Sequence, residues 1–213
     1  GPCAYRLPDG HIQPGFQWLG HRQYLKRMRR CFHQNDLVPH MCSHTTHTYF
    51  IPYHVFFDTI LDGEDFYTEP PTKRDFIDSW RLDRLRFMHP EKWGLITTWL
   101  GWHGGSTNTG GHPTWTFRHN RAYAAALALH DILWTTGHYM TQINRDWMLQ
   151  SRIRLDPSTE FVPYWEPQGL FEHAHEDLKI SAWRRPGWCA VILANVGEER
   201  VEAEVRLDPA RMG

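Results

Sequence analysis

Residues 94–102 read Gly-Leu-Ile-Thr-Thr-Trp-Leu-Gly-Trp, an apolar and β-branched run that opens into a loop rich in Gly, Ser, Thr and Asn. A short run of this kind, bounded by glycines, predicts a buried strand. The pattern that follows predicts a helix over residues 117–129 and a further strand over residues 130–134. Because strand, helix and strand alternate, the stretch 94–134 predicts an α/β fold with a parallel sheet and crossover helices.

The same alternation extends toward the N-terminus. Apolar residues recur at helical spacing over residues 16–33, which predicts an amphipathic helix, and residues 37–44 are typical of a short strand. The aromatic and β-branched stretch 48–58 ends in an acidic turn at residues 61–65. A helix is expected to begin after Pro71 and to end near residue 88, and a last helix is expected over residues 140–153.

After residue 156 the sequence pattern changes from alternating strand and helix to strand alone. Three strand-like runs, at residues 178–184, 188–196 and 200–207, are separated by Arg-Pro-Gly and Gly-Glu-Glu turns. We therefore divide the chain into 1–156 and 157–213. Residues 1–156 supply three or four β/α units, whereas a complete eight-unit barrel takes ~250 residues. The expected architecture is the C-terminal units of a (β/α)8 TIM-type barrel followed by the first strands of an antiparallel β-sandwich, in a fragment of a longer chain or one piece of an assembled protein.

Composition excludes several classes of partner. The chain is 41% hydrophobic and 22% charged with a net charge of -1, which is typical of globular proteins and argues against nucleic acid as the main partner. The longest apolar run, Trp188 to Ala194, is too short for a membrane span. The four cysteines match no zinc-ribbon spacing. No signal peptide is visible, so the compartment stays open, with secretion or a periplasmic location as one option.

Histidine and tryptophan are abundant, with 15 and 11 residues, and together they indicate a polar pocket with aromatic walls. His40 and His44 share one face of the strand predicted over 37–44, and His47 follows in a polar run. Residues at the carboxyl ends of parallel strands face the active site in barrels, so we expect these histidines to contact sugar hydroxyls. A metal site made by these histidines and Cys42 is a weaker alternative, because the spacing matches no known metal motif.

Carboxylates and aromatic side chains come next to other strands. Asp58, Asp62 and Glu64 are placed just after a strand, where they are weak candidates for catalytic acids and better candidates for binding substrate. The sequence predicts further substrate contacts from the strand ends at Trp99, Trp102, His103, His130 and Asp131. Capped core or loop positions remain the alternative for each of these residues. No cofactor or nucleotide motif is present, and the predicted site holds no metal.

These residues stand in an order that resembles the glycoside hydrolase family 123 catalytic domain and its uncharacterised relatives. The landmarks are Cys3 to Leu7, Val38-Pro39-His40, His44-Thr45-Thr46, Phe56-Phe57-Asp58, Leu61-Asp62-Gly63-Glu64, Trp93-Gly94-Leu95, Leu129-His130-Asp131-Ile132, Pro163-Tyr164-Trp165 and Lys179-Ile180-Ser181-Ala182.

The resemblance implies a (β/α) barrel with flanking β-sandwich domains and a retaining exo-hydrolysis of β-linked hexosaminides, in which the substrate's acetamido group attacks the anomeric carbon. In that family an adjacent Asp-Glu pair serves the reaction. This chain contains no Asp followed directly by Glu, so the resemblance places the essential acids on an earlier barrel strand. The expected partner is a carbohydrate, together with the remaining part of a longer chain. Two alternatives stay open: a non-catalytic carbohydrate-binding protein on the same scaffold, and a His-rich metal hydrolase.

Overall fold

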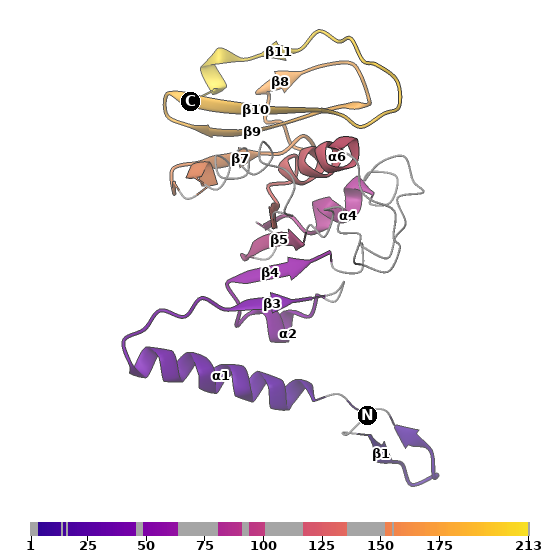
Figure 1. Ribbon diagram of the computed structural model, residues 1–213, viewed down its shortest axis with the longest axis vertical. Helices are drawn as coiled ribbons and strands as arrows, with labels where there is room; N and C mark the ends of the chain where they lie inside the picture. The colour runs from indigo at the N-terminus through magenta and orange to yellow at the C-terminus, as the bar shows by residue number, and fades with distance from the viewer. Residues whose placement is uncertain are drawn as a thin grey trace.

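The computed structural model of the 213-residue chain describes residues 4–13, 15, 17–45, 49–63, 81–90, 94–100, 117–135, 152–154 and 156–212. Helices and strands alternate in the first two thirds of the chain, and strands dominate the last third (Figure 1). The elements are β1 (Tyr5–Arg6), β2 (Ile12–Gln13), α1 (Trp18–Gln34), β3 (Cys42–His44), α2 (Ile51–His54), β4 (Thr59–Asp62), α4 (Leu82–Phe87), β5 (Ile96–Leu100), α6 (Phe117–Ala128), β6 (Leu133–Thr135), β7 (Glu160–Val162), β8 (Phe171–Glu172), β9 (Leu178–Arg185), β10 (Trp188–Asn195), β11 (Arg206–Leu207) and the 3-10 helix η2 (Pro209–Arg211).

Four parallel strands form the sheet of the first part, in the consecutive order β3-β4-β5-β6. The register aligns Asp62 with Trp99 and Trp99 with Trp134, so these three side chains share one face of the sheet. All three are buried, as are the other residues of that face, Ser43, Ile60 and Thr97. The predicted parallel sheet is thereby confirmed for these four strands.

Helices cover this buried face. Leu85 of α4 and Leu127 of α6 pack in one core cluster with Trp99 and Trp134. The hydroxyl of Thr97 donates a hydrogen bond to the carbonyl of Met88, 2.8 Å away, just after α4. The other face of the sheet is more open: Cys42 and His44 are exposed, and Leu61, Thr98 and Leu133 are half-buried. The crossover helices α4 and α6, which follow β4 and β5, therefore pack on the same side of the sheet.

The helix predicted over residues 16–33 is confirmed as α1. Leu25 is buried and Met28 packs beside it, because residues spaced by three and four lie on one face of a helix. Leu25 forms a small core with Met41 and Phe57, which flank β3 and β4. This cluster and the Arg29–Asp58 ion pair attach α1 to the sheet.

The last third of the chain is antiparallel. β9 pairs with β7 and with β10, and β8 pairs with β11 in a separate two-stranded sheet. The Pro186-Gly187 turn between β9 and β10 matches the predicted turn, and Gly187 has φ +74, which glycine adopts without strain. The strand predicted over 200–207 is shorter than expected, since only β11 forms ladder bonds. The structure therefore holds two antiparallel sheets here, in which a sandwich is not established.

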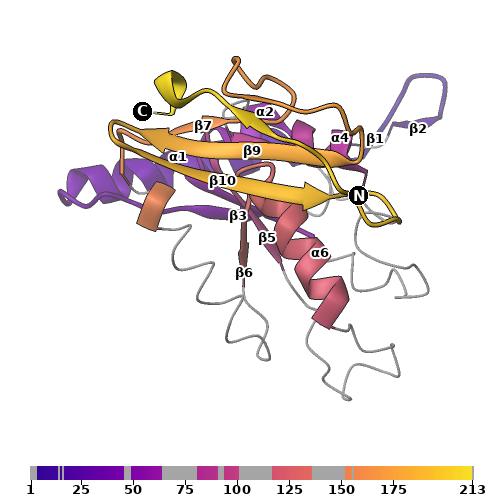
Figure 2. The same cartoon turned by 90° about the horizontal axis from the view of Figure 1, so that it is seen from above.

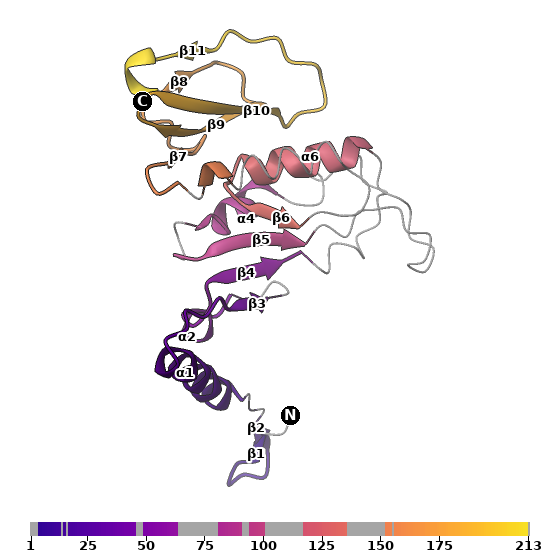
Figure 3. The same cartoon turned by 60° about the vertical axis from the view of Figure 1, so that its left-hand side comes forward.

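The buried core crosses the predicted boundary at residue 156. Phe161 of β7 and Trp183 of β9 belong to the same cluster as Trp99 and Trp134 of the parallel sheet. Figure 3 shows α6 between the parallel strands and the β9–β10 ribbon; α6 contacts β10, and Figure 2 shows the same two elements from above. The parallel and antiparallel parts are thus packed against one another through side chains, and α6 is the layer that they share.

One sequence prediction about local structure needs correction, and two others fall mostly on residues that the structure does not describe. The strand expected just before Asp58 is absent, because residues 51–54 form the short helix α2, with Pro52 in its first turn. The strand lies instead at β4, after Asp58. The helix expected over 140–153 and most of the helix expected from Pro71 lie outside the described residues. Among the described helices, none is long and apolar enough to cross a membrane.

Candidate functional site

The carboxyl ends of the four parallel strands meet at one edge of the sheet. β3 ends at His44, β4 at Asp62, β5 at Leu100 and β6 at Thr135. Ligands of parallel α/β folds bind at this edge, because the loops that follow the strands converge there. Of the predicted site residues, the structure places His44, Asp62 and Trp99 at or next to this edge.

Asp62, the last residue of β4, is a buried carboxylate with several polar partners at this edge. Its side chain has 0% exposure, and a buried carboxylate needs hydrogen-bond and charge partners. Oδ1 accepts the Gly63 N–H at 2.8 Å, and Oδ2 accepts the Tyr49 hydroxyl at 3.2 Å. The Arg84 Nη2 atom lies 3.7 Å from Oδ2. Asp62 therefore joins the end of β4 to Tyr49 and to α4, and its burial suits a positioning role rather than direct contact with substrate.

Tyr49 and Arg84 are site residues that the sequence analysis did not single out. Burial raises the pKa of Tyr49 well above its ordinary value, and the neighbouring carboxylate of Asp62 raises it further. Tyr49 is therefore a neutral hydrogen-bond donor at any physiological pH. No sequence signal pointed to Arg84, because α4 comes twenty residues after β4 and only the fold brings them together.

Trp99 packs against the end of β4 on the buried face of the sheet. The indole is fully buried and lies directly against Gly63, where an added Cβ atom would stand 2.3 Å from Nε1. The Tyr123 hydroxyl donates to the carbonyl of Trp99 at 3.3 Å. A sugar ring needs an exposed aromatic face for stacking, and the described structure gives Trp99 a core position instead.

His44 is an exposed polar residue at the carboxyl edge. It pairs in register with Leu61 and lies on the open face of the sheet, on the same side as Cys42. Thr98 aligns with Leu61 on the next strand, and its Oγ1 atom is buried with no hydrogen-bond partner among the described residues. Burial raises the pKa of the Cys42 thiol, so Cys42 is not an activated nucleophile. His44 is hence the described polar group at this edge that is best exposed for a ligand, whereas the Thr98 hydroxyl is buried.

His40 and Asp58 lie at the opposite end of their strands. His40 Nε2 is 3.1 Å from the hydroxyl of Thr59, the first residue of β4. Asp58 accepts hydrogen bonds from Arg29 at 2.9 Å and from the Met41 N–H at 2.7 Å. Burial acts to raise the pKa of Asp58, but the Met41 N–H and the Arg29 guanidinium outweigh it and lower the pKa. Asp58 thus holds α1 against the sheet, far from the carboxyl edge.

His130 and Asp131 also lie at the amino end of their strand, since both precede β6. His130 is fully buried, and Asp131 Oδ1 accepts a hydrogen bond from the Trp183 indole at 2.9 Å and an ion pair from Arg154 at 2.7 Å. Asp131 has φ +56, the left-handed conformation that Asp tolerates better than most residues. The predicted strand-end contribution to a sugar site is therefore wrong for this pair, which joins the two parts of the chain instead.

Four of the predicted site residues, His47, Glu64, Trp102 and His103, lie outside the described residues. Among the residues that are described, no group of three or more His, Cys, Asp or Glu side chains could hold a metal ion.

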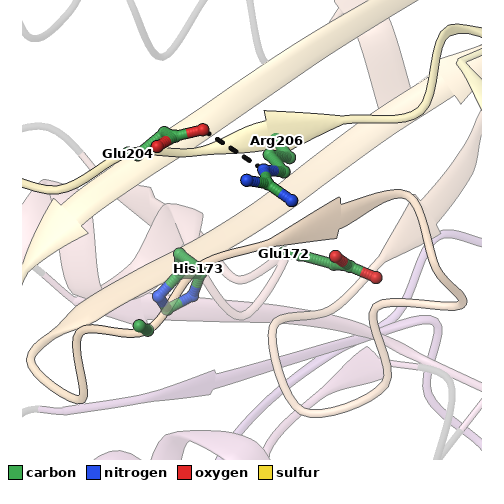
Figure 4. Close-up of a pocket in the computed structure, with 5 residues that line it drawn as sticks. Glu172, His173, Glu204 and Arg206 are labelled. Carbon is green, nitrogen blue, oxygen red and sulfur yellow. Dashed lines mark hydrogen bonds and ion pairs between the residues drawn. The ribbon is translucent and has the colours of Figure 1, made fainter.

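A polar hollow of about 330 Å³ lies on the antiparallel part, between β8 and the chain leading into β11 (Figure 4). Glu172 and His173 line one side, and Glu204 and Arg206, which pair at 3.2 Å, line the other. The hollow has no aromatic wall, and its charged side chains are exposed. It lacks the stacking surface that a sugar site is expected to have.

Comparison with known proteins adds no assignment: no family model, no curated protein and no solved structure matches the chain.

Proposed function

We propose that this chain is part of a glycoside-hydrolase-like protein that binds a carbohydrate at the carboxyl edge and open face of the β3-β4-β5-β6 sheet. The observation that carries the proposal is the arrangement of that sheet. Its parallel strands follow one another in chain order, and the crossover helices α4 and α6 pack on one face. A doubly wound sheet has helices on both faces, whereas a barrel keeps them on the outside.

The open face supports a ligand site. Parallel sheets are ordinarily covered on both faces, yet Cys42 and His44 are exposed and Thr98 is only half-buried. In a barrel this face is the interior, and its carboxyl end is the floor of the active site. The exposed imidazole of His44 at that point provides both a donor and an acceptor for sugar hydroxyls.

Asp62 serves the proposed site by positioning. Its carboxylate fixes the Tyr49 hydroxyl and draws the Arg84 guanidinium to the end of β4. Rigid support of this kind keeps polar groups at the edge within the narrow geometry that binding requires. The chemistry of hexosaminide hydrolysis, which the resemblance implies, needs an adjacent Asp-Glu pair that this chain does not contain. The chain's own contribution is therefore binding and positioning of the sugar.

A non-catalytic carbohydrate-binding protein is the second candidate. It is favoured by the complete burial of Asp62 and by the distance of Asp58 from the edge, which together leave no exposed pair of carboxylates there among the described residues. Hydrolysis of an aryl hexosaminide by the whole parent protein, in which the proposal places the acid pair outside this chain, separates the candidates. Turnover abolished by His44→Ala supports the hydrolase, and sugar binding without turnover supports the binding protein.

A matched pair of variants tests the location of the site. His44 and His40 are both exposed and lie on either side of Cys42, but only His44 is at the carboxyl edge. On an array of oligosaccharides that includes β-linked N-acetylgalactosamine, we expect His44→Ala to weaken retention at least tenfold and His40→Ala to leave it within twofold. Equal loss in both variants, or retention by neither variant nor wild type, contradicts the proposal.

A further inference from the structure

The turn Leu129-His130-Asp131 connects α6 to β6, and three successive residues of it bind the antiparallel part. The Ser181 hydroxyl of β9 donates to the carbonyl of Leu129 at 2.9 Å. The Tyr164 hydroxyl lies 3.2 Å from His130 Nε2, and the Trp183 indole donates to Asp131 at 2.9 Å. We call these three residues the junction turn.

The hydrogen bonds around His130 fix its protonation state. His130 Nδ1 lies 2.6 Å from the carbonyl of Ala126, which can only accept, so Nδ1 carries the proton. In the neutral ring Nε2 is then an acceptor, and the Tyr164 hydroxyl donates to it. If a second proton bound to Nε2, the Tyr164 hydroxyl would have to rotate, and it could then no longer donate a hydrogen bond to the ring.

The surroundings of His130 disfavour a positive charge. The ring is fully buried, stacks on Trp165 with centroids 5.5 Å apart and meets Tyr164 edge-on. Burial lowers the pKa of His130 to about 4, the backbone carbonyls act against this shift, and the charges of His89 and Arg86 lower the pKa further. The charged or titratable groups around the junction are Asp83 and Arg86 of α4, His89 two residues after α4, Tyr164, Lys179 of β9, and the Asp131–Arg154 pair.

His89 strengthens the same contact from the α4 side. Its Nδ1 atom lies 3.0 Å from the carbonyl of His130, so His89 is also a donor to the junction turn. Its ring packs against Phe161 of β7 and against Trp165. The two imidazoles thus lie between the parallel and antiparallel parts, and neither is exposed.

We propose that the junction turn is a pH-sensitive latch, in which protonation of His130 releases the antiparallel sheet from the α4–α6 side of the parallel sheet while both sheets stay folded. The proton binds the open form more tightly, because there the imidazole regains water and an ordinary pKa of about 6.5. The latch is closed above pH 6.5 and is weakened as the pH falls from 6.5 toward 4. The shift in the opening equilibrium is up to roughly 300-fold across that window.

Hydrogen–deuterium exchange of the whole chain, corrected for the pH dependence of intrinsic exchange, tests the latch without any ligand. Between pH 7 and pH 5 we expect at least tenfold faster exchange in peptides that cover residues 129–134 and 162–166. Exchange in peptides covering the β4–β5 pairing and the β9–β10 pairing should change less than twofold. His130→Gln should remove the pH dependence at the junction, because glutamine keeps a donor and an acceptor but does not titrate.

Two further variants, one control and one that alters the junction, are compared with wild type. His11→Gln alters an exposed histidine of the N-terminal hairpin and should retain the wild-type pH dependence. Tyr164→Phe removes a hydrogen bond of the closed junction and should move the midpoint of opening to higher pH, because the closed form is weakened. The proposal is overturned if exchange rises uniformly over both sheets, which would be global acid unfolding, or if the His130→Gln protein opens with the same pH profile as wild type.

Discussion

Asp58 and Asp62 lie at opposite ends of the same strand: Asp58 immediately precedes β4, and Asp62 is its last residue. Asp58 binds Arg29 of α1, whereas Asp62 binds Tyr49 and approaches Arg84 of α4. From the sequence alone, Asp58 and Asp62 are expected to belong to one acidic cluster after a strand. The structure gives the first a role in attaching α1 and leaves only the second near the carboxyl edge.

Asp62→Asn should lower the free energy of unfolding by about 1–3 kcal/mol, because the buried carboxylate accepts from the Tyr49 hydroxyl and the Gly63 N–H and faces the partly exposed Arg84. Urea denaturation followed by circular dichroism measures this change. Asp83→Asn is the matched control, since Asp83 is exposed and its ion pair with the described part of the chain is with the exposed Arg81. Its cost should stay below about 0.5 kcal/mol. Equal costs for the two variants would show that Asp62 does not support the edge.

Arg29→Met should loosen α1 and cost about 1–2 kcal/mol, because Arg29 donates to both Asp58 and the carbonyl of Phe56. Arg30→Met, an exposed neighbour on the same helix, should cost almost nothing. Since the folded state lowers the pKa of Asp58, the contribution of this pair is present above the ordinary pKa of 3.8 and is lost as the pH falls below it. An Arg29→Met effect that persists unchanged at pH 2 would contradict this account.

Gly63→Ala should destabilise the protein more than Gly187→Ala does. Both glycines have positive φ, +97 and +74, so both substitutions incur a backbone cost of about 1–2 kcal/mol. Only at Gly63 does the new Cβ collide with an indole, that of Trp99, whereas Gly187 has open space around it. In thermal unfolding, Gly63→Ala should lower the free energy of unfolding by about 1–3 kcal/mol more than Gly187→Ala does. Equal losses would mean that Trp99 does not pack beneath Gly63.

Ser181→Ala should weaken the contact between the parallel and antiparallel parts. The Ser181 hydroxyl is fully buried, accepts the Tyr164 N–H at 3.0 Å and donates to Leu129. Its removal leaves a buried N–H and a buried carbonyl without this partner, at a cost of about 1–3 kcal/mol. Ser158→Ala, at an exposed turn, is the control and should cost less than about 1 kcal/mol. Chemical denaturation of both variants measures the difference.

The sequence predicted the elements that have strong local signals. The spacing of Leu25, Met28 and Phe32 predicted α1, the apolar run ending at Trp99 predicted β5, and the Arg-Pro-Gly turn predicted the β9–β10 hairpin. These patterns are local, because period and turn chemistry act over a few residues.

Assignments that depend on tertiary contacts were less accurate. The aromatic stretch 48–58 suggested strand, yet His54 caps its own helix through the Phe50 N–H, and the strand begins only at Thr59. His130 and Asp131 looked like strand-end residues, and the fold places them before β6, in contact with β9. Whether a polar residue precedes or follows a strand shifts it from one edge of the sheet to the other, and sequence boundaries are too coarse to decide this.

The central claim is that the carboxyl edge and open face of the parallel sheet bind a carbohydrate. The most direct measurement is a nuclear magnetic resonance titration of the isotopically labelled chain with the strongest oligosaccharide ligand from the array. The account predicts saturable shift changes at His44, Leu61 and Thr98, with Glu172, His173 and Arg206 unaffected. Absence of any saturable change, or changes confined to the hollow between β8 and β11, would contradict it.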